Sequence, residues 1–169
     1  MPLYKYCIFL LILALGSLNS NSQSSADEKT DFFNPDNFLG DTLYIESHFT
    51  ECGEFGGHLE LMKIFLVRKE FYISYEKFSA DCKTIKDNNG EPKQTLLKTL
   101  NKKILEDEKR LIRNYIHQLV DAKFGEPNLS HSGYIFKLEN TDKSIHLFVY
   151  TMDGKVEQDY IEFIRKLFQ

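Results

Sequence analysis

Two β-prone segments around a short polar turn constrain the fold of this chain most strongly. Residues 58–67 and 71–78 are mostly apolar with a period of two, and the polar residues 68–70 stand between them. This pattern predicts an antiparallel β-hairpin. Cys52 and Cys82 lie at similar distances on either side of the turn, so the hairpin would bring them opposite each other. We therefore predict a Cys52–Cys82 disulfide at the open end of the hairpin.

The first 22 residues have the three-part pattern of an export signal. A lysine precedes an apolar run over residues 7–16, and small and polar residues follow. The run is shorter than the roughly twenty apolar residues that span a bilayer. Ser20 and Ser22 suit signal cleavage, so the mature chain is expected to begin at Gln23, with an uncleaved anchor as the alternative. We predict an exported protein, periplasmic or secreted, in which two cysteines pair oxidatively.

Cleavage would leave 147 residues with a net charge of −5, because the removed segment holds one lysine and no acidic residue. That length suits one domain. The acidic balance argues against nucleic acids as partners, and against a membrane once the signal is removed. Residues 23–40 are predicted to be a flexible polar lead-in, and residues 41–169 a single domain.

The remaining patterns predict an α+β domain. Further strands are expected at residues 42–49, 134–139 and 144–152, and amphipathic helices at 106–124 and from 154 onward. The predicted helix stripes are Leu111, Ile112, Tyr115, Ile116, Leu119, Val120 and Phe124, and then Val156, Tyr160, Ile161, Ile164, Leu167 and Phe168. Residues 94–105 fit either a helix or an edge strand, and both stay open. We expect an antiparallel sheet of about five strands built from hairpins, with the two helices packed on one face.

The segment 51–60 is the densest cluster of groups that could bind or react. Its candidate binding residues are Glu54, Phe55, His58 and Glu60. Strand alternation would place His58 and Glu60 on one face, about 7 Å apart at the backbone. A metal site of Cys52, His58 and a glutamate is one hypothesis, but the paired ligand spacings typical of zinc sites are absent. Its three glycines predict a tight bend or a bulge, and a rigidly held loop of this kind commonly carries recognition.

The sequence carries no recognisable catalytic motif. It contains neither Gly-x-Ser-x-Gly nor His-Glu-x-x-His, and no phosphate-binding glycine pattern. No catalytic residue, metal ligand or cofactor is assigned. We expect a small exported, non-enzymatic protein with a binding or structural role, whose protein or small-molecule partner the sequence does not identify. The alternatives are a metal-dependent or thiol hydrolase centred on residues 51–60 and a secreted inhibitor that presents the 53–57 loop.

Overall fold

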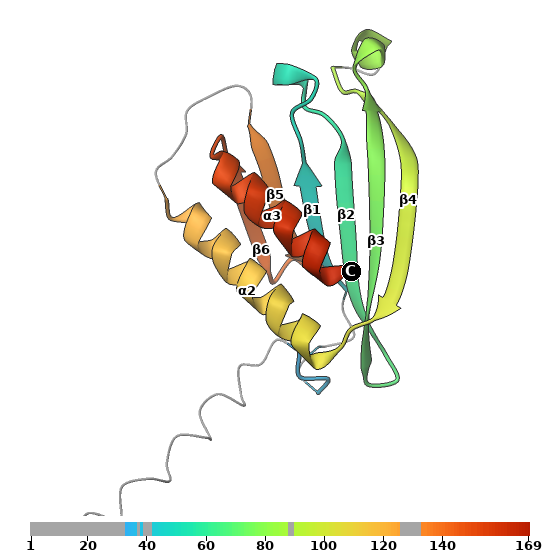
Figure 1. Cartoon of the computed structure of the whole chain (residues 1–169), viewed down its shortest axis with the longest axis vertical. Coiled ribbons are helices and arrows are strands. Elements are labelled where there is room, and N and C mark those ends of the chain that lie inside the picture. The colour runs from blue at the N-terminus through green and yellow to red at the C-terminus, as the bar shows by residue number, and fades with distance from the viewer. Residues whose placement is uncertain (1–32, 37, 39–41, 88–89, 126–132) are drawn as a thin grey trace, which may run out of the picture. The chain divides into compact units, whose positions relative to one another are not determined.

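The computed structural model describes residues 33–36, 38, 42–87, 90–125 and 133–169. The predicted signal peptide and the part of the lead-in before residue 33 lie outside the described residues. The described chain forms one antiparallel sheet and two α-helices, which confirms the predicted α+β class (Figure 1). The sheet has six strands rather than about five.

The first four strands are joined in order as antiparallel neighbours, the first long helix separates them from a final hairpin, and the second long helix follows that hairpin. The elements are β1 (Leu43–His48), β2 (Leu59–Val67), β3 (Glu70–Asp81), β4 (Lys93–Lys103), α2 (Glu106–Lys123), β5 (Tyr134–Asn140), β6 (His146–Thr151) and α3 (Gly154–Leu167). Short 3-10 turns occur at η2 (Gly53–Phe55) and η3 (Cys82–Asp87). The strand order across the sheet is β4-β3-β2-β1-β5-β6, so β1 lies between β2 and β5.

The predicted hairpin is formed by β2 and β3. Val67 pairs with Glu70, which leaves Arg68 and Lys69 as a two-residue turn. Both turn residues have positive φ, at 51° and 68°. Two consecutive residues with positive φ are the signature of the hairpin turn whose twist matches that of the strands. The turn therefore fixes the register that sets residue 60 opposite residue 77.

Residues 93–103 form an edge strand, which resolves the alternatives left open for 94–105. The pairing of β4 with β3 shifts by one residue between Lys77 and Phe78, so β4 carries a bulge. Leu100 pairs with Tyr75, and beyond the bulge Leu96 pairs with Phe78. The bulge puts these two leucines on opposite faces of the sheet. Their four-residue spacing, which suits a helix, therefore comes from a bulged strand.

Both helices pack on the same face of the sheet, over β1, β5 and β6 in Figure 1. The buried residues of α2 are Ile112, Tyr115 and Leu119, and those of α3 are Tyr160, Phe163 and Leu167. The predicted stripes were too wide, because Phe124 is 84% exposed and Ile161 is 53% exposed. The stripe for α3 also omitted Phe163, which stacks on Tyr115 with ring centroids 4.2 Å apart. Contact between the two helices thus selects a narrower face than hydrophobicity alone indicates.

Part of the predicted lead-in packs on the domain. The side chains of Phe33 and Phe38 are buried, and each ring meets the ring of Phe71 edge-on at about 5 Å between centroids. The compact unit accordingly begins at Phe33. These contacts close the end of the core next to the β2–β3 turn.

The other face of the sheet carries paired charges. Lys63 contacts Glu76 at 3.3 Å, and Lys137 contacts Glu139 at 2.6 Å. Charged pairs of this kind suit a solvated sheet face. None of the described helices is long and apolar enough to span a bilayer.

Candidate functional site

The segment between β1 and β2 is held by its own backbone. The N–H of Cys52 donates to the carbonyl of Gly56 at 2.7 Å, and the N–H of Phe49 donates to the carbonyl of His58 at 3.0 Å. Gly56 has a φ of 83°, which favours glycine. A Cβ atom at Gly57 would lie 2.8 Å from the carbonyl oxygen of Phe49, so the chain can pass there only without a side chain. The glycines therefore make a tight, specific bend.

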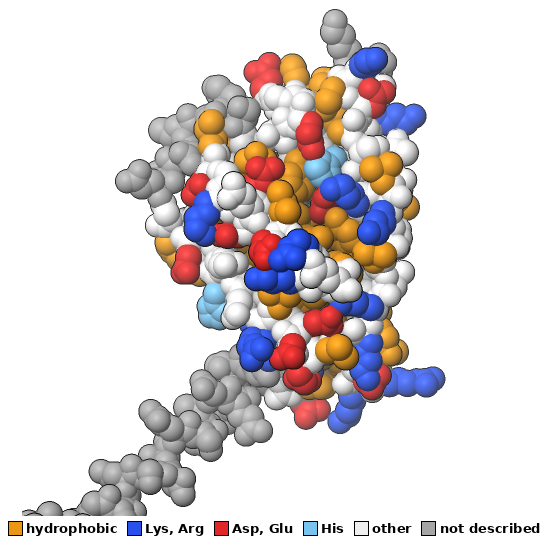
Figure 2. All heavy atoms as spheres, viewed as in Figure 1, with side chains coloured by type: hydrophobic (Ala, Val, Ile, Leu, Met, Phe, Trp, Pro, Cys, Tyr) orange, Lys and Arg blue, Asp and Glu red, His pale blue; other side chains and the backbone are white. Residues whose placement is uncertain are grey.

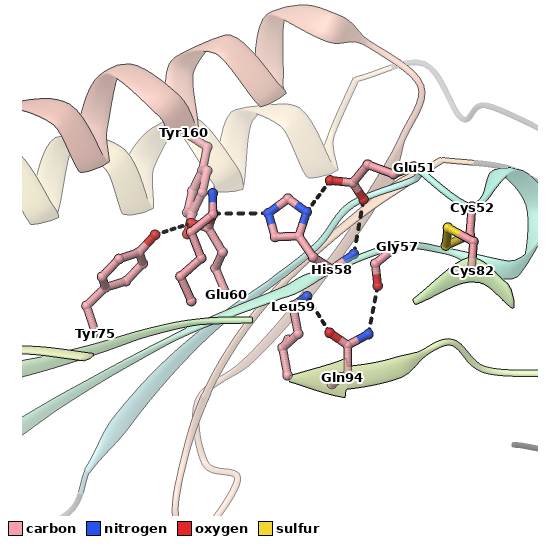
Figure 3. A network of polar contacts seen from close by, with 11 residues as sticks. Glu51, Cys52, Gly57, His58, Leu59, Glu60, Tyr75, Cys82, Gln94 and Tyr160 are labelled. Atoms are coloured by element: carbon pink, nitrogen blue, oxygen red, sulfur yellow. Dashed lines mark hydrogen bonds and ion pairs between the residues drawn. A yellow bond between two sulfur atoms is a disulfide. The ribbon is translucent and has the colours of Figure 1, made fainter. Parts of the chain in front are cut away.

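A disulfide anchors this bend to the end of β3. Cys52 and Cys82 are bonded, as the hairpin geometry predicted, and they are 30 residues apart in sequence (Figure 3). In this state neither sulfur is a thiol, so neither is available as a nucleophile. The bond ties the bend to the start of η3.

A glutamine from the edge strand fixes the other side of the bend. The Nε2 of Gln94 donates to the carbonyl of Gly57 at 2.8 Å, and its Oε1 accepts from the N–H of Leu59 at 3.2 Å (Figure 3). One amide side chain thus binds the backbone on both sides of His58. The entry to β2 is consequently clamped to β4, a strand with which β2 does not pair.

Glu60 is the centre of the polar cluster on the helix-facing side of the sheet. Its residue is only 3% exposed, yet four side chains bind its carboxylate. The hydroxyls of Tyr75 and Tyr160 each donate to Oε2 at 2.6 Å. Lys77 donates to Oε1 at 2.5 Å. The Nε2 of His58 lies 3.1 Å from the same oxygen (Figure 3). We call these residues together with Glu51 the Glu60 network.

His58 links the network to the bend. Its Nδ1 contacts the carboxylate of Glu51, and its backbone N–H donates to the other oxygen of that carboxylate at 3.0 Å. Its ring stacks on Phe49 with centroids 4.2 Å apart and planes 1° from parallel. Both ring nitrogens therefore face carboxylates, an arrangement that favours the doubly protonated imidazolium.

The pKa directions agree with this geometry. Burial by itself would raise the pKa of Glu60, but hydrogen bonds from His58, Lys77 and the two tyrosines outweigh it and lower the pKa to about 2. Burial works to lower the pKa of His58, but the bond to Glu60 and the charge of Glu51 raise it above the usual 6.5. Burial and the Glu60 carboxylate raise the pKa of both Tyr75 and Tyr160. The carboxylate of Glu60 is thus held in its charged form, and the protonated form of His58 is favoured more than in a free imidazole.

A pocket of about 200 Å³ opens over the network. Phe49, Ile161 and Ile164 contribute apolar wall, and the Glu60 network supplies polar groups. Figure 2 shows hydrophobic side chains exposed between α3 and the strands beside it, next to lysine or arginine side chains. Every polar side chain of the network that lines this pocket already has a partner within the protein. The pocket consequently offers a surface for contact and little free hydrogen-bonding capacity.

The bend faces a second pocket with the two remaining candidate residues. Glu54 and Phe55 line a pocket of about 440 Å³, together with residues 90–92, Gln94, Gly133, Ile135 and Tyr150. We call this the loop pocket. Neither Glu54 nor Phe55 lines the pocket over the Glu60 network. The four candidate residues therefore divide into two pairs, with His58 and Glu60 in one site and Glu54 and Phe55 in another.

Sequence reasoning identified His58 and Glu60 but missed their partners. Tyr75 and Lys77 could be found from the hairpin register, because Glu60 pairs with Lys77 and Met62 with Tyr75. Nothing in the local sequence connects Tyr160 to a residue 100 positions away. Gln94 was likewise hidden, because its segment was not assigned to the sheet.

The chemistry open to these groups is limited by how they are already bonded. Both oxygens of Glu60 accept hydrogen bonds, and both ring nitrogens of His58 face acids. Among the described residues, no group of three or more histidine, cysteine or acidic side chains is arranged to hold a metal ion.

No model of a known protein family matches the chain, and no curated protein matches it significantly.

Proposed function

We propose that this chain is a small exported, non-enzymatic binding protein, and that the disulfide-anchored bend between β1 and β2 forms its binding element. The observation that carries the proposal is the orientation of Glu54 and Phe55. Neither side chain is buried in the core, Phe55 is 47% exposed, and both line the loop pocket. Exposed side chains on a rigidly held loop commonly carry recognition.

The Glu60 network supports this proposal as scaffold. It joins β2, β3 and α3 beneath the bend, and its acids and bases neutralise one another. A general base needs a free lone pair within reach of a substrate proton. Saturated pairing therefore favours a positioning role for the network over catalysis. Preorganisation of this kind reduces the entropy lost when a ligand binds.

Export is part of the proposal. The Cys52–Cys82 bond suits an oxidising compartment, where disulfides persist. The two alternatives, a hydrolase centred on residues 51–60 and an inhibitor that presents residues 53–57, use the same segment. They differ from the proposal in turnover and in the class of partner.

The test is a nuclear magnetic resonance screen of the oxidised mature protein with chemically diverse fragments and short peptides. Ligands should shift the backbone amide signals of residues 53–57, 90, 91, 93 and 94, and Phe55→Ala should make these shifts smaller at the same ligand concentration. Phe124→Ala is the matched control, because Phe124 follows the last residue of α2, is highly exposed and does not line the loop pocket. Ligands that shift only other regions would contradict the proposal.

A parallel assay separates binding from hydrolysis. Ester, amide and phosphoester substrates should show no turnover above buffer, with or without added zinc. Turnover that is lost in both His58→Gln and Glu60→Gln, while the folded fraction is unchanged, would favour the hydrolase. Inhibition of a protease that disappears in Phe55→Ala would favour the inhibitor.

A further inference from the structure

A disulfide, a glutamine side chain and close backbone contacts hold the walls of the loop pocket. The Cys52–Cys82 bond and the Gln94 side chain hold the bend on one side. On the other side, a Cβ atom at Gly133 would lie 2.8 Å from the ring of Tyr150, so the ring lies directly against the backbone. A cavity that depends on such close contacts is a formed feature of the fold.

The lining of the loop pocket is apolar and aromatic. Phe55, Leu59, Ile135 and Tyr150 contribute carbon surface, and Pro92 is buried at the edge. Ligand sites generally combine such surface with a few polar groups that select the ligand. Gln94 is not available for this selection, because both ends of its amide bind the backbone.

The carboxylates that remain for selection are those of Glu54 and Glu91. His48 also lines the pocket, but its ring contacts Glu46 at 3.6 Å, and the described lining residues include no lysine or arginine. Both carboxylates are exposed, and within the described residues neither makes a hydrogen bond or an ion pair. This contrasts with Glu51 and Glu60 on the other side of the bend, which are paired with His58. Two unpaired carboxylates beside aromatic rings provide both charge attraction and cation–π contact for a positive group.

We infer that the loop pocket binds an ammonium group carried on an apolar stem, either as a free alkyl amine or as a lysine side chain of a partner. The inference rests on the proposed binding function and specifies its ligand. The stem lies against Phe55, Leu59 and Ile135, and the ammonium group lies toward Glu54 and Glu91. The two carboxylates disfavour an anionic ligand of the same length.

The test compares three probes with the same six-carbon stem, namely hexylammonium, 1-hexanol and hexanoate. Dissociation constants come from amide shift titrations of the oxidised protein at low salt. Hexylammonium should bind about 3- to 20-fold more tightly than 1-hexanol, because exposed ion pairs each contribute at most a few-fold. Hexanoate should bind most weakly. At 1 M salt the preference should disappear, since screening then acts over about 3 Å.

Paired variants locate the effect. Glu54→Gln combined with Glu91→Gln should remove the preference for hexylammonium over 1-hexanol. Phe55→Ala should weaken the binding of all three probes. Glu106→Gln is the control, because Glu106 begins α2 at the end of the sheet opposite η2, and it should change nothing (Figure 1). A lysine whose α-amino and carboxyl groups are both blocked distinguishes the two sources of the ammonium group. An affinity equal to that of hexylammonium indicates a lysine side chain of a partner, and a weaker affinity indicates a free alkyl amine.

Equal affinity for hexylammonium and 1-hexanol would overturn the inference, as would a preference that survives the double glutamine variant. Shifts confined to residues outside the loop pocket would overturn it too. Tight 1-hexanol or hexanoate binding at this pocket would leave the proposed binding function standing, so the two conclusions fail separately.

Discussion

Replacing Glu60 with glutamine should destabilise the folded protein by about 3 kcal/mol at neutral pH. The carboxylate is buried and accepts charge-assisted hydrogen bonds, which hold its pKa at about 2 against an ordinary value of 4.5. Each pKa unit corresponds to about 1.4 kcal/mol of preference for the charged form. The ionised carboxylate therefore contributes about 3 kcal/mol to the free energy of unfolding. A glutamine side chain would also place its N–H groups opposite side chains that are themselves donors, and these unsatisfied contacts lower the free energy of unfolding further.

The stabilisation by Glu60 should depend on pH in a direction set by its lowered pKa. Because the folded pKa is depressed, the contribution is fully present above about pH 4.5 and is lost as the pH falls toward 2. Below that range Glu60 is protonated in both states and resembles glutamine. The stability difference between wild type and Glu60→Gln should therefore be about 3 kcal/mol at pH 7 and shrink steadily between pH 4.5 and pH 2.

Urea unfolding followed by circular dichroism at several pH values measures this difference. Glu162→Gln is the matched control, because its carboxylate also has a pKa lowered to about 2, by Arg165 and Lys166, but lies in solvent. Solvent screening should make its effect much smaller. A loss below about 1 kcal/mol for Glu60→Gln at pH 7, or a loss that stays constant down to pH 2.5, would refute the reasoning.

Four further predictions follow from the fold and the site. Cys82→Ala should lower the free energy of unfolding by about 2–5 kcal/mol in non-reducing urea titrations, and an unchanged midpoint would mean that the bond does not form in solution. Ile112→Ala should destabilise by about 2–5 kcal/mol because the side chain is fully buried on α2, whereas Arg110→Ala on the exposed side should stay within about 0.5 kcal/mol. The raised pKa of His58 means that its stabilising charge is present below about pH 6.5 and lost as the pH rises through the folded value. The melting temperature of the wild type should therefore fall as the pH rises through this value, and His58→Gln should abolish that fall. Parallel profiles of melting temperature against pH for the two proteins would contradict this. Intact-mass measurement of exported protein should show cleavage after Ser22, and a retained amino terminus would exclude the predicted signal.

Local patterns were sufficient for most elements of the fold. The two-residue turn at 68–69 and the flanking alternation specify the β2–β3 hairpin, and the hairpin in turn brings the two cysteines together. The start of α2 was predictable because acidic residues suit the positive end of a helix. Asp153 caps α3 by accepting from the N–H of Lys155, as expected of a residue before a helix.

Long-range contacts decided what local patterns left open. Residues 93–103 became a strand because β3 presents an unpaired edge, and the bulge opposite Lys77 then redistributed the leucines between the two faces. On α3, contact with Tyr115 selected Phe163 as a buried residue and left Ile161 in solvent. Hydrophobicity alone does not report which side of a helix a neighbour covers.

The candidate site divides in the same way. The sequence by itself determined that His58 and Glu60 share a face and that glycines bend the preceding loop, because strand alternation and glycine backbone freedom are local properties. Only the tertiary structure brought Tyr160 to Glu60 and Gln94 to the bend, since these contacts span 100 and more than 30 residues. Such contacts depend on helix packing and strand order, which are collective results of burying the core. As a result of the same packing, the groups of the Glu60 network bind one another, whereas Glu54 and Phe55 face the loop pocket.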